Sequence, residues 1–308
     1  MSRPTRIDAL LVLMAIIWGT NFSIIKSAFR ELEPQAFNAM RMAIASLAFL
    51  VVMAGARFLP SDGRATSIFQ TSNKVTPRDW LALLVLGIIG HVLYQYFFIG
   101  GLARTSVANS SLMLAASPVV IALMSAIIGH ERVGPMHWAG AAVSAFGIYL
   151  VVGQGLALGS SGLTGDLMMF AAVCCWAAYT VGARPLMDRH SPVGVNGLSM
   201  ALGAAIYLPA SWTQVRAVDW TSVSPWTLGL LVYSALFALC VAYTIWYVGV
   251  RQIGSARTSA YSNLIPIVAM TSAVVFLKEP LSLRKVAGAA AVLAGVALTR
   301  VSIRQPTA

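Results

Sequence analysis

Aromatic and polar side chains recur at helical spacing within long apolar stretches of this sequence. One group has spacings of three, four and seven residues, which place its members on one face of a helix: His91, Tyr94, Gln95 and Phe98. A second group has the same kind of spacing: Tyr243, Trp246 and Tyr247. Indole and phenol rings stack on planar ligands and attract cations, while amide and hydroxyl groups provide a few fixed hydrogen bonds. These faces suit a small amphipathic solute with an apolar or aromatic body and a polar head.

The same stretches offer no set of catalytic or metal-binding residues. Asp8 and Asp166 stand at the starts of apolar segments, and no Asp or Glu lies in the middle of one. His130-Glu131 begins the zinc-protease motif, but Gly134 stands where the second histidine is required. All three cysteines lie within apolar segments, where packing is their expected role: Cys174, Cys175 and Cys240. We therefore expect no enzyme, no cofactor and no metal site.

The elements that hold these faces are membrane-spanning helices. Hydrophobic residues make up 58% of the chain and charged residues 10%, against about 25% charged residues in a soluble domain. Segments of about 20 apolar residues, enough to cross a bilayer, can be drawn ten times. Their approximate ranges are 8–28, 36–56, 79–101, 107–129, 136–153, 166–185, 193–211, 226–248, 256–276 and 284–301. The sequence predicts an all-α integral membrane protein.

The chain contains one sequence pattern twice. A shift of 158 aligns Trp18 with Trp176, and a shift of 148 aligns Pro118 with Pro266. We expect two five-helix halves, 1–153 and 154–308, around a central cavity. Because five is an odd number of crossings, the second half must start on the opposite side of the bilayer from the first. This arrangement is an inverted repeat.

The net charge of +11 indicates topology rather than nucleic-acid binding. The basic residues are scattered through the loops and form no cluster, so we expect no nucleic-acid partner. Most of them fall on one side when the N-terminus is placed in the cytoplasm, which favours both termini inside. The first apolar segment lacks a small-residue cleavage site after it, so we expect a retained helix rather than a signal peptide.

Polar and aromatic residues in the predicted spans 1, 3, 4, 6, 8 and 9 should face this cavity, because an unsatisfied polar group in hydrocarbon is costly. The predicted substrate-binding residues are Trp18, Asn21, His91, Tyr94, Gln95, Phe98, Ser110, Trp176, Tyr179, Tyr243, Trp246 and Tyr261. For single members other roles stay open. A Tyr or Trp can belong to the interfacial belt, and an Asn can bond a neighbouring helix. His91 can be structural, or it can act on substrate or protons.

Three further features are expected to shape the bundle. Pro118 and Pro266, at equivalent positions, interrupt their helices and form either static kinks or a pair of hinges. Arg41, near the start of its span, either reaches the outer surface or binds a carboxylate or another helix. Small residues at helical spacing predict close helix packing: Gly140, Ser144, Ala287, Ala291 and Gly295. We expect a monomer, and a dimer through these faces stays open.

Several motifs resemble those of the drug/metabolite transporter superfamily in its ten-helix, EamA-type branch. The run Trp18-Gly19-Thr20-Asn21-Phe22 is similar to the first-helix signature, and Arg41 is similar to the arginine of the second helix. The spacing of Glu131, Gly140 and Gly147 matches the signature of helices 4 and 5, and the second half repeats it: Glu279, Gly288 and Gly295. The resemblance covers residues 8–300.

This resemblance implies export of metabolites or drugs across a bacterial inner membrane by alternating access. The aromatic set is most similar to that of YddG-type exporters, which implies small neutral substrates such as aromatic and hydrophobic amino acids. Two departures limit the analogy. Trp176 is followed by Ala177-Ala178-Tyr179-Thr180, so Asn21 has no symmetric counterpart, and the first span lacks the coupling glutamate of small dimeric relatives. A multidrug or organic-cation exporter, or a passive channel, are the alternatives.

Overall fold

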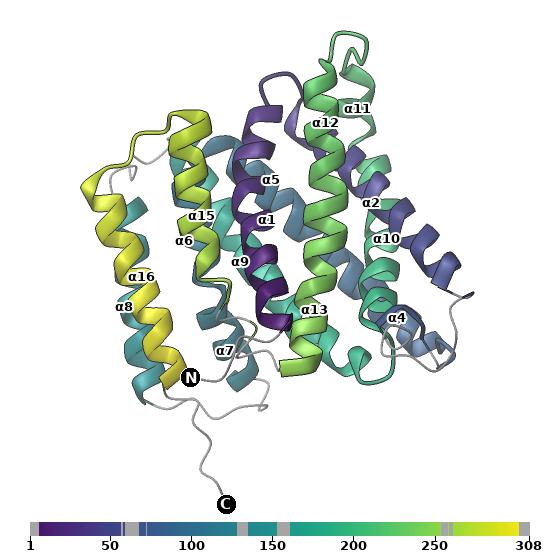
Figure 1. Ribbon diagram of the computed structural model, residues 1–308, viewed down its shortest axis with the longest axis horizontal. Coiled ribbons are helices and arrows are strands. Elements are labelled where there is room, and N and C mark those ends of the chain that lie inside the picture. The colour runs from purple at the N-terminus through teal and green to yellow at the C-terminus, as the bar shows by residue number, and fades with distance from the viewer. Residues whose placement is uncertain are drawn as a thin grey trace, which may run out of the picture.

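The computed structural model describes residues 6–56, 58, 68–71, 73–127, 135–152, 161–253, 258 and 261–301. All regular structure in these ranges is helical (Figure 1). The elements are α1 (Arg6–Ala28), α2 (Pro34–Ala56), α4 (Pro77–Gly87), η1 (Ile88–Leu93), α5 (Tyr94–Arg104), α6 (Val107–Ala115), α7 (Ser117–Ile127), α8 (Pro135–Val152), α9 (Ser161–Met187), α10 (Pro192–Ala210), α11 (Trp212–Ala217), α12 (Pro225–Tyr233), η3 (Ser234–Val241), α13 (Ala242–Ile253), α15 (Leu264–Ser272), η4 (Ala273–Leu277) and α16 (Leu283–Val301). His130, Glu131 and the predicted boundary at 153–154 lie outside the described residues.

Six of the described helical segments are long and apolar enough to cross a membrane. They are Arg6–Ala28, Pro34–Ala56, Pro77–Arg104, Gly162–Met187, Pro192–Ala210 and Pro225–Ile253. Shorter apolar helices cover Val107–Ile121, Trp138–Leu150 and Leu264–Leu277. Large apolar side chains project outward from the bundle, as in Trp138, Phe146 and Tyr149, each more than half exposed. This is the surface expected where lipid is the solvent, and the chain is a multi-pass membrane protein.

Short polar residues followed by proline start several of the helices. The Thr76 hydroxyl accepts a hydrogen bond from the Asp79 amide, and the Asp79 carboxylate accepts one from the Thr76 amide, which completes a capping box at α4. Ser224 caps α12 through the Thr227 amide, and Ser191 caps α10 through the Gly194 amide. Proline at the first helical position has no amide hydrogen that would need a partner. The sequence signals for these helix starts are therefore local.

Two long segments contain a wider helical turn near the middle of the bundle. η1 joins α4 to α5, and η3 joins α12 to α13. Both are π-helical, and they occupy equivalent positions when the sequence is shifted by 148 (88 onto 236, 93 onto 241). A π-helical turn leaves backbone carbonyls out of the regular ladder and is often found at functional sites.

Pro118 and Pro266 lie in the first turns of α7 and α15, next to turns that divide the predicted spans 107–129 and 256–276. Pro118 is the second residue of α7, which follows a turn at Ala116, and Pro266 is the third residue of α15. Proline is tolerated in a first helical turn. The carbonyls four residues before the prolines cannot bond to a proline nitrogen, and they are satisfied locally: Leu114 by the Ser117 hydroxyl, and Ser262 by the Ile265 amide at 3.1 Å.

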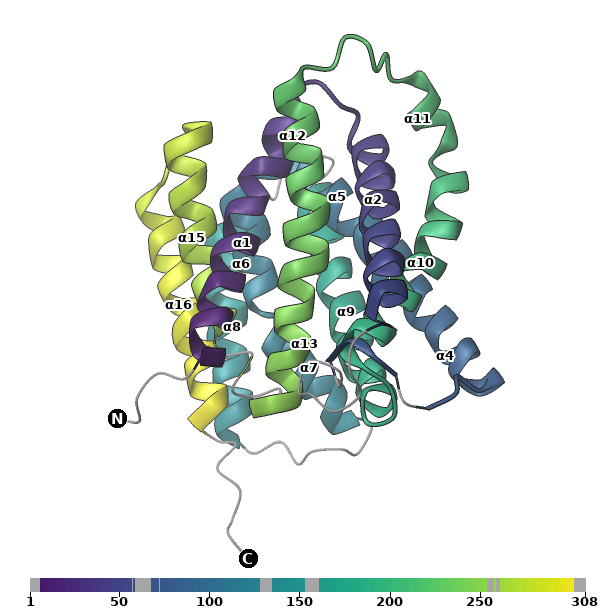
Figure 2. The same cartoon turned by 45° about the vertical axis from the view of Figure 1, so that its right-hand side comes forward.

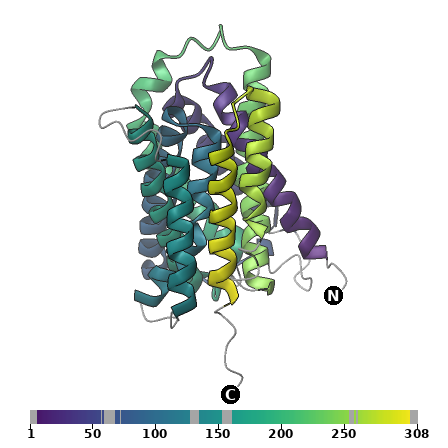
Figure 3. The ribbon, with the colours of Figure 1, turned by 90° about the vertical axis from the view of Figure 1, so that its left-hand side faces the viewer.

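The first and second parts of the chain pack against one another along the whole bundle. α5 packs on α9, α1 on α13 and α15, α2 on α10 and η3, and α10 on η1. α8 and α16 form a separate pair at one side of the molecule, visible at the left of Figure 1. The start of α1 and the end of α16 lie at the same end of the bundle (Figures 2 and 3).

α8 and α16 meet through the small residues that the sequence singled out. A methyl group on Gly147 would lie 2.6 Å from the Val292 amide nitrogen and 2.8 Å from the Gly288 carbonyl oxygen. A methyl group on Gly295 would lie 2.5 Å from the Gly140 carbonyl oxygen. Ser144 donates a hydrogen bond to the Val292 carbonyl at 3.3 Å. The small faces are therefore used within one chain.

Candidate substrate cavity

A cavity lies between helices from both parts of the chain. The part of it that water can enter has a volume of about 90 Å³, and the cavity is partly open to the outside. Its walls come from α1, α2, α5, α6, α9, η3 and α13, together with the first parts of α7 and α15 and the turn before α15. Eight of the predicted residues line it: Trp18, Asn21, Tyr94, Gln95, Phe98, Trp176, Tyr243 and Trp246.

Three tryptophans and a tyrosine form the aromatic centre of this cavity. The rings of Trp18 and Trp176 meet edge-on, with centroids 6.0 Å apart and planes at 90°. Trp18 also lies 5.5 Å from Tyr243 and 5.7 Å from Trp246. Its indole nitrogen donates a hydrogen bond to the Ala238 carbonyl at 2.9 Å, a carbonyl within η3. The π-helical turn therefore helps to orient the central indole.

A second aromatic wall continues from this centre toward α5. Tyr94 lies 5.4 Å from Trp176 and stacks on Phe98 at 5.7 Å, with 12° between their planes. Phe22 meets Phe98 edge-on at 5.5 Å. These distances are those of attractive aromatic pairs. The rings therefore support one another's positions in the wall.

Arg41 is the charged residue among the described lining residues. Its side chain is 1% exposed, and three neighbouring oxygens fix the guanidinium. Nη2 donates to the Asn38 Oδ1 at 2.8 Å and to the Gln95 Oε1 at 2.6 Å, and Nη1 donates to the Ser234 Oγ at 3.2 Å. The expectation that Arg41 reaches the outer surface is therefore wrong. Acceptors on α2, α5 and η3 hold it inside the bundle.

Three polar atoms of the lining residues have no hydrogen-bond partner among the described residues. They are Arg41 Nε, Trp246 Nε1 and Asn21 Oδ1, and all three are buried. The first two are donors and the third is an acceptor. Buried polar atoms are normally paired, so unpaired ones at a cavity wall need an explanation.

His91 and Tyr179 lie behind the cavity wall in a polar network of their own. His91 Nε2 lies 3.2 Å from the Tyr179 hydroxyl and 3.3 Å from the Ser199 hydroxyl. The Tyr179 hydroxyl donates to the Asn196 Oδ1 at 3.1 Å. This network joins η1, α9 and α10. The structure places both residues in the contact between the two parts of the chain, outside the described cavity lining.

Ser110 and Tyr261 are also outside that lining. Ser110 is fully buried on α6. The Tyr261 hydroxyl donates to the Asp8 carboxylate at 2.7 Å and so ties the start of α1 to the segment before α15. For these two residues, as for His91 and Tyr179, substrate contact stays a prediction.

The cavity lining includes residues that the sequence reasoning did not assign to it. Ala238 and Leu239 come from η3, and Ser117 and Ile265 come from the breaks at the two prolines. Phe22 was visible in the first-helix motif, and its spacing of four residues from Trp18 places both on one helix face. The π-helical turns η1 and η3 had no signal in the sequence.

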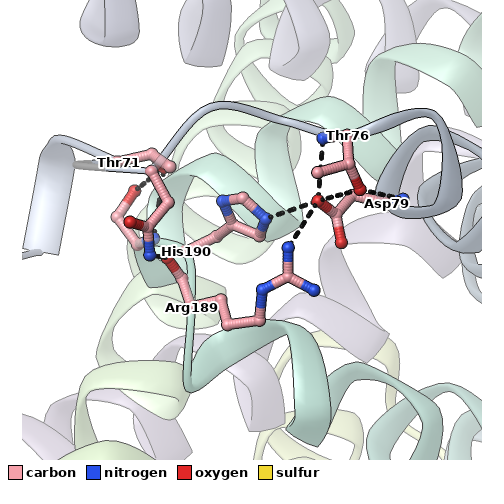
Figure 4. A network of polar contacts seen from close by, with 7 residues as sticks. Thr71, Thr76, Asp79, Arg189 and His190 are labelled. Atoms are coloured by element: carbon pink, nitrogen blue, oxygen red, sulfur yellow. Dashed lines mark hydrogen bonds and ion pairs between the residues drawn. The ribbon is translucent and has the colours of Figure 1, made fainter.

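Polar contacts tie the two parts of the chain at both ends of the bundle. At the end where α4 starts, the Asp79 carboxylate accepts hydrogen bonds from Thr76 and forms an ion pair with Arg189 at 3.1 Å (Figure 4). His190 Nε2 lies 3.3 Å from the same carboxylate oxygen. At the other end of α1, the Glu31 carboxylate accepts hydrogen bonds from the amide and hydroxyl of Ser224 at 2.8 and 2.9 Å.

The fold and the cavity define a class, that of multi-pass helical membrane proteins with an internal aromatic site. Residues 5–153 and 163–301 each match the EamA-like transporter family, and the chain belongs to this family. It is 26% identical over 302 residues to the uncharacterized transporter YyaM of Bacillus subtilis (strain 168). The alignment covers 96% of this chain and 94% of that protein.

Two further similarities extend this comparison. The chain is 24% identical over 314 residues to the probable amino-acid metabolite efflux pump of Escherichia coli (strain K12), with 99% of this chain and 97% of that protein covered. A protein of known crystal structure, 20% identical, has a TM-score of 0.63 with 94% of each chain covered. At this identity the likeness supports the fold alone.

Proposed function

We propose that this transporter exports small neutral amphipathic metabolites, with aromatic and hydrophobic amino acids as the main class. The observation that carries the proposal is the aromatic cavity. Trp18, Trp176 and Tyr243 surround a space whose walls are apolar rings with a few polar atoms. Such walls bind an apolar body by burial and stacking, and they orient a polar head by hydrogen bonds. The amino-acid metabolite pump among the relatives supports the same class.

We propose further that the mechanism is alternating access between two inverted five-helix halves, 1–153 and 154–308. Separate family matches to residues 5–153 and 163–301 support the duplication. Paired contacts support a two-fold relation. Trp18 meets its own equivalent, Trp176, and the small residues of α8 and α16 meet in the same reciprocal way. In such transporters, substrate sites lie at the interface between the repeats and broken helices border them.

In this mechanism the two ends of the bundle open in turn. The Asp79 and Glu31 contacts join the two halves at opposite ends and would close the cavity on one side each. The breaks at Pro118 and Pro266 border the cavity, and we propose that they act as hinges. Both termini would face the cytoplasm, and the protein would lie in the inner membrane of a bacterium. One copy would suffice, because the small faces of α8 and α16 are already paired.

Transport into liposomes tests this function. Liposomes that contain the purified protein should take up an aromatic or hydrophobic amino acid faster than empty liposomes, and uptake should saturate and show counterflow. A set of all twenty amino acids and several organic cations separates the alternatives. Uptake equal to that of empty liposomes for every amino acid would contradict the proposal. Preference for organic cations would favour a cation exporter, and uptake without saturation or counterflow would favour a channel.

A further inference from the structure

We infer that Arg41 is the binding site for a carboxylate group of the transported solute. This inference rests on the proposed function and narrows it: the substrates carry a carboxylate, as amino acids do, and organic cations without one are poor ligands. The inference concerns the cavity between α1, α2, α5 and α13, where Arg41, Trp246 and Asn21 all belong to the lining and each has one buried polar atom without a described partner.

The first step is that Arg41 carries a buried charge with no counterion. The described ion pairs both involve Asp79, at one end of the bundle, and none involves Arg41. No Asp or Glu is among the described residues that line the cavity. A charge removed from water is costly unless an opposite charge lies beside it. A ligand with a negative group would supply the missing partner.

The second step is that the guanidinium is held in a fixed orientation. Asn38, Gln95 and Ser234 accept its hydrogen bonds, and each of the three is nearly or fully buried. These neutral acceptors hold the group in place and leave its charge uncompensated. The Nε donor has no partner among the described residues. A planar, preorganised group with a free donor is the arrangement that recognises carboxylates.

The third step is that the remaining unpaired atoms fit an amino acid. The Trp246 indole nitrogen is a second free donor at the wall, and the Asn21 Oδ1 is a free acceptor. Donors suit a carboxylate, and an acceptor beside aromatic rings suits an ammonium group. α7 and α15 also begin at the cavity, with Ser117 and Ile265 in its wall, and helix N-termini favour negative charge. A bare organic cation would use the rings and the acceptor but would meet the positive charge of Arg41.

A ligand series on the wild-type protein tests the inference without any substitution. Binding is measured by the change in tryptophan fluorescence, since Trp18, Trp176 and Trp246 all line the cavity. The probes are leucine and phenylalanine, the amide of each, and 3-phenylpropionate. We expect each acid to bind about tenfold or more tightly than its amide, the effect of a hydrogen bond to a charged group. Equal affinities for acids and amides, or no binding of any acid at millimolar concentration, would overturn the inference.

Substitution of Arg41 gives a second test. In the Arg41→Met variant the preference for acid over amide should disappear, whereas Arg41→Lys should keep part of it because the charge remains. Arg216→Gln removes an exposed arginine on α11 and serves as the matched control, with an unchanged preference. If Arg41→Met does not fold, the wild-type series and Arg41→Lys still decide. A full acid preference in folded Arg41→Met would overturn the inference.

Counterflow of the same compounds in liposomes separates this inference from the proposed function. Acids that bind selectively but show no counterflow would defeat the proposed function and leave the carboxylate site standing. Transport of acids and amides at equal rates would support a transporter of amphipathic solutes and defeat the carboxylate site.

Discussion

The indole rings at the centre of the cavity both line it and hold neighbouring groups in place. Trp18 touches the rings of Trp176, Tyr243 and Trp246, and it also bonds a carbonyl of the π-helical turn η3. Each aromatic contact contributes about 0.5–1.5 kcal/mol beyond simple burial. Loss of one indole therefore removes a binding surface and also loosens its neighbours.

We predict that Trp18→Ala and Trp176→Ala each lower transport about tenfold or more, because each change removes several ring contacts at the site. The measurement is initial uptake into liposomes at equal protein content. Trp226→Ala is the matched control, since this indole is 72% exposed at the start of α12. Full activity in both cavity variants would show that the aromatic centre does not contact substrate.

Much of the aromatic set could be predicted at the level of single residues. The repeat offsets bring Trp18 near Trp176, and helical spacing places Tyr94 and Phe98 on one face. The position of Arg41 could not be predicted, because two of its three acceptors, Gln95 and Ser234, are distant in sequence and Ser234 belongs to a π-helical turn. The helical spacing predicted that His91 faces the cavity. In the structure His91 lies in the π-helical turn η1, and its Nε2 contacts the hydroxyl groups of Tyr179 and Ser199.

At the scale of helices, the regular segments follow from local signals. Runs of apolar residues bounded by caps such as Thr76 and Ser224 fix where helices start and how long they are. The π-helical turns η1 and η3 have no local signal in the sequence. The prolines indicated an interruption, but not that each would fall in the first turn of a new helix.

The contact between α8 and α16 allows a prediction about helix packing. Gly147→Ala should lower the melting temperature of the purified protein, because the added methyl group meets backbone atoms that cannot move aside, at 2.6 and 2.8 Å. Overpacking of this kind costs about 1–3 kcal/mol. Gly229→Ala is the control, since a methyl group there meets nothing within 4 Å, and it should leave stability equal or higher. A destabilised Gly229→Ala with a stable Gly147→Ala would contradict the packing described.

For the whole molecule, the polar contacts at the two ends suggest how the cavity is sealed. The amide and hydroxyl of Ser224 lower the pKa of the Glu31 carboxyl below its ordinary value. The contact is therefore fully formed above the ordinary glutamate pKa and is lost as the pH falls through the lowered one. Because Glu31 is at the surface, we expect this contact to shift the balance between conformations rather than to hold the fold together.

We predict that Glu31→Gln and Asp79→Asn shift accessibility of the cavity in opposite directions. A cysteine introduced by Ala238→Cys, after replacement of the three native cysteines by alanine, reports on the cavity wall. Labelling with an impermeant maleimide is compared in right-side-out and inside-out vesicles. Asp79→Asn should speed labelling from the side where α1 starts, and Glu31→Gln from the other side. Arg216→Gln is the control, and equal changes on both sides in either variant would contradict two separate seals.

The reciprocal fit of α8 and α16 has a mechanical consequence. Their glycines bring the two backbones into contact, so this pair has little room to slide or tilt. Its outer surface, by contrast, carries large rings such as Trp138 and Tyr149. In the alternating-access mechanism that we propose, this pair would be the fixed reference against which the remaining helices move. An antibody fragment or fused marker bound to α8 and α16 would enlarge the particle for electron microscopy, and on this proposal we expect transport to continue.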